Sequence, residues 1–103
     1  MPRVSFDIQF EWDPRKAHTN RNKHGVSFEL AVTVFQDPKL LTIHDTQHSA
    51  DEDRWITLGR DRGGKLLVIV HTWDEREDQA ARVRLISARP ATSREKKHYE
   101  TTL

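Results

Sequence analysis

Residues 54–73 read RWITLGRDRGGKLLVIVHTW, and this stretch decides the fold. It contains two segments, residues 54–59 and 65–73, that have the length and composition of β-strands. The RDRGG sequence between them ends in two glycines, which permit a tight hairpin. Residues 66–70 are apolar on both faces, so we expect the second strand to lie near the centre of a sheet.

Further strands are predicted on both sides of this hairpin. Residues 40–44 and 81–88 are strand-like, and short connections favour antiparallel neighbours, so the four segments predict an antiparallel meander. Nearer the N-terminus, Phe6, Ile8 and Phe10 alternate with polar residues, which is typical of a half-buried strand.

Three helices are predicted from their capping signals. Residues 13–24 begin with Asp-Pro, which caps the first free amides and fits the first turn, and they end before Gly25, which can adopt the left-handed conformation. Residues 27–36 begin with a capping serine and place apolar residues on one face, and Asp37-Pro38 ends this helix. A Thr-x-x-Glu capping box at residues 92–95 starts a short final helix.

The predicted element order is therefore β-α-α-β-β-β-β-α. This order predicts an α+β fold, in which a small antiparallel sheet is flanked by helices that cover one face and leave the other partly open. The sequence contains no internal repeat, low-complexity tract or linker, so residues 1–103 are expected to form a single domain.

Three absences in the sequence bear on localisation. The chain lacks cysteine, and its longest apolar run, residues 66–70, is too short to span a membrane. The N-terminal residues also lack the apolar segment of a secretory signal. These features predict a cytoplasmic protein that does not associate with membranes.

The formal net charge is only +1, but the charges are unevenly distributed. Residues 15–24 contain four Lys or Arg and no acid, and residues 82–97 contain six against one glutamate, whereas acids gather at residues 45–53 and 74–78. Such clusters occur by chance in highly charged soluble domains, but they also create local fields that attract polyanions. Arginine is costly in a partly buried strand unless an anion meets it, so the pattern predicts a phosphate-handling surface.

Several motifs recur in a characteristic order along nearly the whole chain. They are FEWDP at residues 10–14, Asn20 with KHGVSF at 23–28, VFQD at 34–37, His48, Glu52, Arg54 and Gly59, and ISARPAT at 86–92 with Glu95 and Tyr99. In order and spacing, these motifs resemble the BrnT family of bacterial toxins.

The resemblance implies a ribonuclease toxin of a type II toxin–antitoxin system, with a RelE-like fold, that cuts RNA (messenger RNA as the expected substrate) without a metal. It also implies a co-expressed BrnA-type antitoxin, a ribbon-helix-helix protein that represses the shared operon, so that the toxin contacts operator DNA only through the antitoxin. One segment departs from the family pattern. Residues 73–78, WDERED, form a long acidic turn where a threonine, a short turn and an arginine are expected, and Arg76 is aligned with that arginine.

Metal-free cleavage of RNA needs a base for the 2′-hydroxyl, an acid for the leaving 5′-oxygen and cations for the charge that develops at phosphorus. We assign the acid–base pair to His48 and Glu52, because histidine as a class titrates near neutrality and both residues precede a strand. Arg54, Arg84 and Arg89 are the candidates for charge stabilisation, since a guanidinium meets two phosphate oxygens at once.

Each of these assignments has a structural alternative. The acid–base pair could instead lie in a solvated acidic loop, or Glu52 could position an arginine. Arg84 and Arg89 are predicted to point to opposite sides of their strand unless a bulge or the strand end intervenes. Arg89 could also act as a clamp on Glu95 or Asp13.

A second group of residues is predicted to contact RNA: Lys16, Lys23, His24, Arg76 and Tyr99. Cations near the end of a helix also favour the helix dipole, so capping is an alternative role for Lys23 and His24. Tyr99 could stack on a base, or its ring could pack beneath the sheet.

The spacing His44-x3-His48-x3-Glu52 would place three metal ligands on one face of a helix, but this segment is predicted as strand and loop. We therefore expect neither a metal nor another cofactor. The leading hypothesis is a toxin endoribonuclease. The alternatives are a non-catalytic RNA-binding or repressor-complex module that uses the same basic surface, and a degenerate toxin whose acidic turn at residues 74–78 repels RNA.

Overall fold

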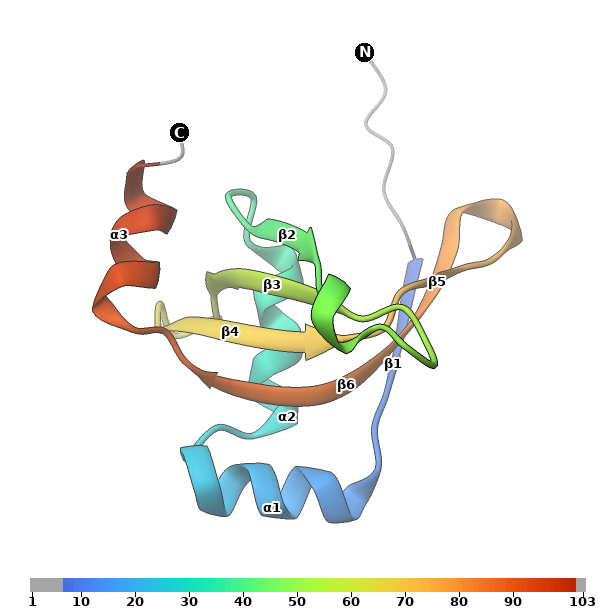
Figure 1. Cartoon of the computed structure of the whole chain (residues 1–103), viewed down its shortest axis with the longest axis horizontal. Helices are drawn as coiled ribbons and strands as arrows, with labels where there is room; N and C mark the ends of the chain where they lie inside the picture. The colour runs from blue at the N-terminus through green and yellow to red at the C-terminus, as the bar shows by residue number, and fades with distance from the viewer. Residues whose placement is uncertain (1–6, 102–103) are drawn as a thin grey trace.

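The computed structural model of the chain describes residues 7–101, except for the side chain of Asp78. A mixed sheet is packed against helices on both faces (Figure 1). Phe6, with which the first predicted strand begins, lies outside the described residues. In chain order the elements are β1 (Asp7–Glu11), α1 (Pro14–His24), α2 (Phe28–Ala31), the 3₁₀ segment η1 (Val32–Gln36), β2 (Leu41–His44), η2 (Thr46–His48), β3 (Trp55–Arg60), β4 (Leu66–His71), β5 (Asp74–Glu75), η3 (Glu77–Gln79), β6 (Ala80–Pro90) and α3 (Ser93–Thr101).

The strands follow the order β1-β6-β4-β3-β2, and the short β5 pairs with β6 off this path. β2, β3, β4 and β6 pair antiparallel with their neighbours, so the predicted meander is confirmed. β1 instead runs parallel to β6, with Asp7 opposite Ala80 and Glu11 opposite Arg84. The sheet is therefore mixed rather than purely antiparallel, because β1 and β6 are joined through most of the chain and not by a short turn.

A β-bulge in β6 sets the direction of its arginines. The register between β4 and β6 shifts by one residue at Ile86. Leu85 before the bulge and Ala88 after it are buried in the same core. Arg84 and Arg89 therefore point together toward the other face of the sheet, because a bulge, the exception that the prediction allowed, intervenes between them.

Helices cover both faces of the sheet, whereas the sequence predicted cover on one face. α1, α2 and η1 lie against one face, where Phe28 and Val34 are fully buried. α3 packs on the other face through Tyr99, which clusters with Leu58 and Val68. In Figure 1, α3 lies at the end of the sheet opposite to β5. Tyr99 is the buried residue of α3. The sequence of this helix therefore shows no apolar face that would predict which side of the sheet it covers.

The predicted caps of the first two helices are confirmed. The Asp13 carboxylate accepts a hydrogen bond from the Arg15 amide at 2.8 Å, and Gly25 has a φ of 70°. The Ser27 hydroxyl accepts one from the Leu30 amide at 3.2 Å, although the second helix continues as 3₁₀ after one turn. Within residues 7–101, none of the helices has the length and apolar character that crossing a lipid bilayer requires.

Asn20 connects α1 to β6 through a side chain that is only 6% exposed. Its amide nitrogen donates to the carbonyls of Val26 at 3.0 Å and Ala88 at 2.8 Å. Its amide oxygen accepts from the backbone N–H of Ala88 at 3.0 Å. One side chain thus satisfies three buried backbone groups beside the bulge.

Replacing Asn20 by alanine should leave these three backbone groups unpaired in the core. We expect Asn20→Ala to lower the free energy of unfolding by about 3 kcal/mol, measured by urea denaturation. Asn22→Ala on the exposed side of the same helix is the matched control and should change it little. Equal effects of the two variants would show that Asn20 does not hold α1 on the sheet.

Candidate functional site

Two neighbouring hollows flank the middle of β6. The first, which we call the arginine hollow, has a volume of about 390 Å³. It brings together three residues of the predicted site. Glu52 comes from the loop before β3, Arg76 from the turn after β5, and Arg84 from β6. Its lining residues are Glu11, Glu52, Asp53, Thr72, Trp73, Asp74, Arg76, Arg82 and Arg84.

Each arginine of the arginine hollow is paired with a carboxylate. All three pairs are partly exposed, so water screens them and each contributes little to stability. The pairs are Arg84 with Glu52, Arg82 with Glu11 at 3.8 Å, and Arg76 with Asp74 at 2.9 Å.

The backbone holds Arg84 in place at this hollow. Its amide donates to the hydroxyl of Thr72 at 3.0 Å, and its carbonyl accepts from the Thr72 amide at the same distance. Glu52 reaches the guanidinium from the loop before β3, 32 residues away in the sequence. The alternative in which Glu52 positions an arginine therefore describes its placement, with Arg84 as the partner.

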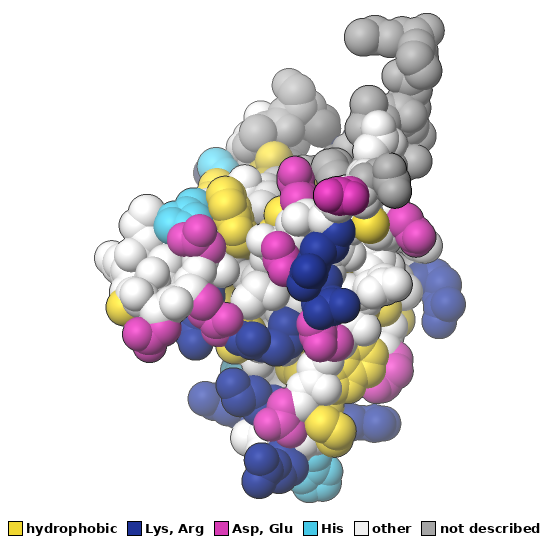
Figure 2. All heavy atoms as spheres, turned by 90° about the vertical axis from the view of Figure 1, so that its right-hand side faces the viewer, with side chains coloured by type: hydrophobic (Ala, Val, Ile, Leu, Met, Phe, Trp, Pro, Cys, Tyr) yellow, Lys and Arg dark blue, Asp and Glu magenta, His cyan; other side chains and the backbone are white. Residues whose placement is uncertain are grey.

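The second hollow, which we call the α1 groove, lies between α1 and the bulge of β6 and has a volume of about 400 Å³. Lys16, Lys23 and His24 all line it, next to Ile86 and Ser87 of β6. Figure 2 shows dark blue side chains gathered toward the end of the molecule where α1 lies, while blue and magenta alternate above them. The α1 groove is therefore the more cationic of the two hollows.

His48 and Arg54 lie in or next to the loop that supplies Glu52. The side chain of His48 is 66% exposed, and its Nδ1 lies 3.0 Å from the carboxylate of Asp45. With a proton on Nδ1, this bond leaves Nε2 as the free acceptor. The Nε of Arg54 is buried and has no hydrogen-bond partner among the described residues.

Arg89 and Glu95 form a clamp at the far end of β6. Two guanidinium nitrogens each donate to one oxygen of the Glu95 carboxylate at 2.8 Å. This hydrogen bonding raises the pKa of Arg89 and lowers the pKa of Glu95 to about 2. Glu95 also completes the predicted capping box, since it accepts from the amide of Thr92 at 2.8 Å. Arg89 is therefore placed as a clamp on Glu95, the structural alternative to charge stabilisation, and it does not line the arginine hollow.

Tyr99 is only 6% exposed, and its hydroxyl donates to the carboxylate of Asp37. Burial and this hydrogen bond raise the pKa of Tyr99. Burial raises the pKa of Asp37, but the hydrogen bonds that it accepts from Arg60, Tyr99 and Lys39 outweigh this effect and lower it overall. Tyr99 therefore packs beneath the sheet, as the alternative to base stacking predicted.

The His44-x3-His48-x3-Glu52 spacing does not bring its three residues together. His44 contacts Asp53 at 3.1 Å, whereas His48 and Glu52 have the partners given above. No group of three His, Cys, Asp or Glu residues that could hold a metal ion is found in the described part of the chain.

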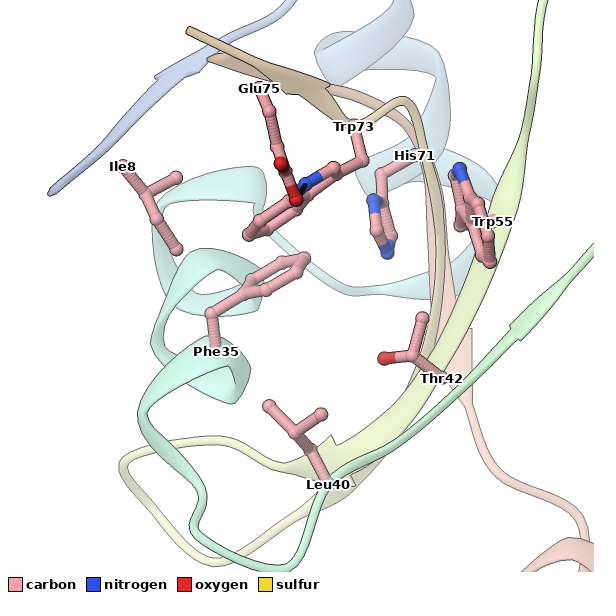
Figure 3. A pocket seen from close by; sticks show the side chains of 8 residues that line it. All are labelled: Ile8, Phe35, Leu40, Thr42, Trp55, His71, Trp73 and Glu75. Atoms are coloured by element: carbon pink, nitrogen blue, oxygen red, sulfur yellow. Dashed lines mark hydrogen bonds between the residues drawn. The ribbon is translucent and has the colours of Figure 1, made fainter. Parts of the chain in front are cut away.

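A third hollow, which we call the aromatic pocket, was not predicted from the sequence (Figure 3). It has a volume of about 590 Å³ and lies between η1 and the sheet. The signal that could have found it is the hairpin register, which places Trp55 opposite His71, two residues before Trp73. Its lining residues are Ile8, Phe35, Leu40, Thr42, Trp55, His71, Trp73 and Glu75.

Comparison with known proteins places the chain in a class. A family profile described as "Ribonuclease toxin, BrnT, of type II toxin-antitoxin system" matches residues 12–95. The class is thus the ribonuclease toxins of type II toxin–antitoxin systems. The chain belongs to the BrnT family, as its motifs indicated.

The solved structures support the same fold. A crystal structure of the Brucella abortus ribonuclease toxin BrnT is similar to this chain with a TM-score of 0.52 and 21% sequence identity. The similarity covers 84% of this chain and 100% of that chain, and it shows a shared fold. None of the curated proteins compared with the chain matches it.

The Glu95 clamp predicts how stability depends on pH. The folded-state pKa of Glu95, about 2, lies below its ordinary value of 4.5. Its contribution to stability is therefore fully present above pH 4.5 and is lost as the pH falls toward 2. Between about pH 6 and pH 3, we expect the free energy of unfolding to fall less in Glu95→Gln than in the wild type. Parallel losses in the two proteins, measured by urea denaturation, would contradict this role.

Proposed function

We propose that this protein is a toxin endoribonuclease that cleaves messenger RNA in the cytoplasm through its 2′-hydroxyl group, without a metal or other cofactor, and that residues 1–103 act as one RelE-like domain. The observation that carries the proposal is the exposed pair of Glu52 and Arg84 in the arginine hollow, next to the α1 groove. A cation that stabilises the charge at phosphorus and a carboxylate that transfers a proton are two of the groups that cleavage of a phosphodiester requires.

The reaction assigns a separate role to each member of this pair. Phosphate oxygens bind the guanidinium of Arg84 and displace Glu52, which then lies beside the reacting phosphate. A base takes the proton of the 2′-hydroxyl, the 2′-oxygen bonds to phosphorus, and the bond to the 5′-oxygen breaks. An acid protonates that leaving oxygen, so the products are a cyclic phosphate and a 5′-hydroxyl.

Glu52 and His48 are the proposed acid–base groups. Asp45 supports this role for His48, because a carboxylate at Nδ1 orients the ring and leaves Nε2 for proton transfer. Arg54 is proposed to stabilise charge with Arg84, because it follows the loop that carries Glu52. Arg89 is proposed as a positioning residue that holds α3 rather than as a phosphate ligand.

The RNA strand is proposed to run from the α1 groove to the arginine hollow. The two hollows adjoin along the chain, since Asp13 lines one and Glu11 the other, while Ile86 lines one and Arg84 the other. Lys16, Lys23 and His24 would follow the backbone phosphates, and Arg76 would lie at the far side of the cleavage point.

A BrnA-type antitoxin is the proposed inhibitor, and operator DNA would be contacted through it. An inhibitor must cover the arginine hollow and the α1 groove to exclude RNA. The α1 groove favours an acidic segment in such a partner. When the antitoxin releases this segment, an RNA phosphate would again be able to replace Glu52 on the guanidinium of Arg84.

The proposal is tested by cleavage of a defined RNA in the presence of EDTA. The wild type should cut with a bell-shaped pH profile, and a 2′-deoxy substitution at the cut site should abolish cleavage. Arg84→Gln should lower kcat/KM by about 10²–10³-fold. Arg62→Gln, a change at an exposed arginine in the β3–β4 turn, is the matched control and should leave it unchanged.

Two outcomes would contradict the proposal. Cleavage of the 2′-deoxy substrate would exclude the 2′-hydroxyl as nucleophile. Binding of RNA without cleavage at any pH would instead indicate the non-catalytic RNA-binding module.

A further inference from the structure

The aromatic pocket has the size and walls of a site for a small planar ligand. Its volume of about 590 Å³ falls within the roughly 300–1,000 Å³ of typical ligand sites. Figure 3 shows Phe35 and Trp73 on one side of the space, and Trp55 and Thr42 on the other. Aromatic walls of this kind suit a nucleobase, because every base offers a flat face for stacking.

The pocket adjoins the proposed cleavage site. Trp73 lines both the aromatic pocket and the arginine hollow. Two residues after Trp73, Glu75 lines the aromatic pocket, and the following residue, Arg76, lines the arginine hollow. Arg84 faces away from η1, whereas the pocket lies between η1 and the sheet, and the two spaces meet at Trp73. An RNA strand that binds Arg84 and passes over Trp73 around this end of the sheet can place a neighbouring base in the pocket, which favours RNA over other occupants.

A buried chain of hydrogen bonds fixes the polarity of one wall. The ring of His71 is 1% exposed, and its Nδ1 lies 2.8 Å from the carbonyl oxygen of Thr72. A carbonyl only accepts, so Nδ1 carries the proton. Burial lowers the pKa of His71, so the ring is neutral and its Nε2 accepts from the hydroxyl of Thr57 at 2.6 Å.

The chain continues to the pocket surface at Thr42. Because the Thr57 hydroxyl donates to His71, its oxygen accepts from the hydroxyl of Thr42 at 2.8 Å. The proton of Thr42 is therefore used inside the sheet. Its oxygen, which points toward the space in Figure 3, offers the pocket lone pairs only.

Glu75 adds a second acceptor across the pocket. One carboxylate oxygen accepts from the indole N–H of Trp73 at 3.2 Å. The other receives no hydrogen bond from the described residues. Thr42 and Glu75 thus both present hydrogen-bond acceptors to the pocket, and a ligand must supply the donors.

We propose that the aromatic pocket binds one base of the RNA strand next to the cut phosphodiester, and that its acceptor groups select guanine over uracil. Guanine presents two adjacent donors, N1–H and the 2-amino group, to a carboxylate. Uracil presents one N–H between two carbonyl oxygens, which would face acceptors. This inference rests on the proposed function, since it makes the pocket the specificity site of that ribonuclease.

The test uses tetranucleotides UUGU and UUUU with 2′-O-methyl groups, which block the nucleophile and allow binding to be measured without cleavage. UUGU should bind the wild type about tenfold more tightly than UUUU and shift the indole N–H signals of Trp55 and Trp73 in NMR spectra. Glu75→Gln replaces an acceptor by a donor and should abolish the preference. Glu29→Gln, an exposed carboxamide change on α2, is the matched control and should retain it.

Equal affinities for the two oligonucleotides, or an unperturbed Trp55 signal, would overturn the inference while RNA cleavage in EDTA remained intact. Loss of the preference in Glu29→Gln as well would also overturn it. If purified antitoxin shifts the Trp55 signal and the oligonucleotides do not, the pocket is a protein-docking site and the inference is wrong. Failure to cut any RNA would count against the proposed function, whereas the binding preference would stand independently.

Discussion

Hydrogen bonding along both edges of β6 is the constraint on which the rest of the structure depends. β1 pairs with one edge, and β5 and β4 share the other. Asn20 fixes the strand to α1 at Ala88, two residues beyond the bulge. Because the strand cannot shift without breaking these bonds, Arg84 is held at a fixed position in the arginine hollow.

The arginine hollow is lined by four carboxylates and three arginines, so the proposed site is not simply cationic. The arginines of the hollow are held by carboxylates from β1, a loop and β5, whereas the lysines of the α1 groove have no comparable ring of acids. These ion pairs hold the guanidinium groups in a defined geometry, and in the proposed function RNA phosphate replaces a carboxylate on them. Under that proposal Glu52 has two functions, since it orients Arg84 in the free protein and would lie next to the phosphate after the exchange.

Local features of the chain could be predicted from the sequence, and contacts between distant segments could not. The helix caps formed by Asp13, Ser27 and Thr92 depend on residues a few positions apart, so the local sequence predicts them. The bulge at Ile86 and the parallel pairing of β1 depend on packing across the sheet, which leaves no local signal. The sequence did not identify the ion-pair partner of Arg84 for the same reason, since Glu52 lies 32 residues away along the chain. His48 and Arg89 were singled out as chemical groups, but their neighbours Asp45 and Glu95 decide what each can do.

The central claim is that Glu52 and Arg84 act as one unit on the phosphate. A double-mutant cycle on kcat/KM for RNA cleavage, with Glu52→Gln, Arg84→Gln and the double variant, tests it most directly. The account predicts that the double variant loses little more activity than the more damaged single variant. Losses that multiply would contradict it, because they would mean that the two groups act independently.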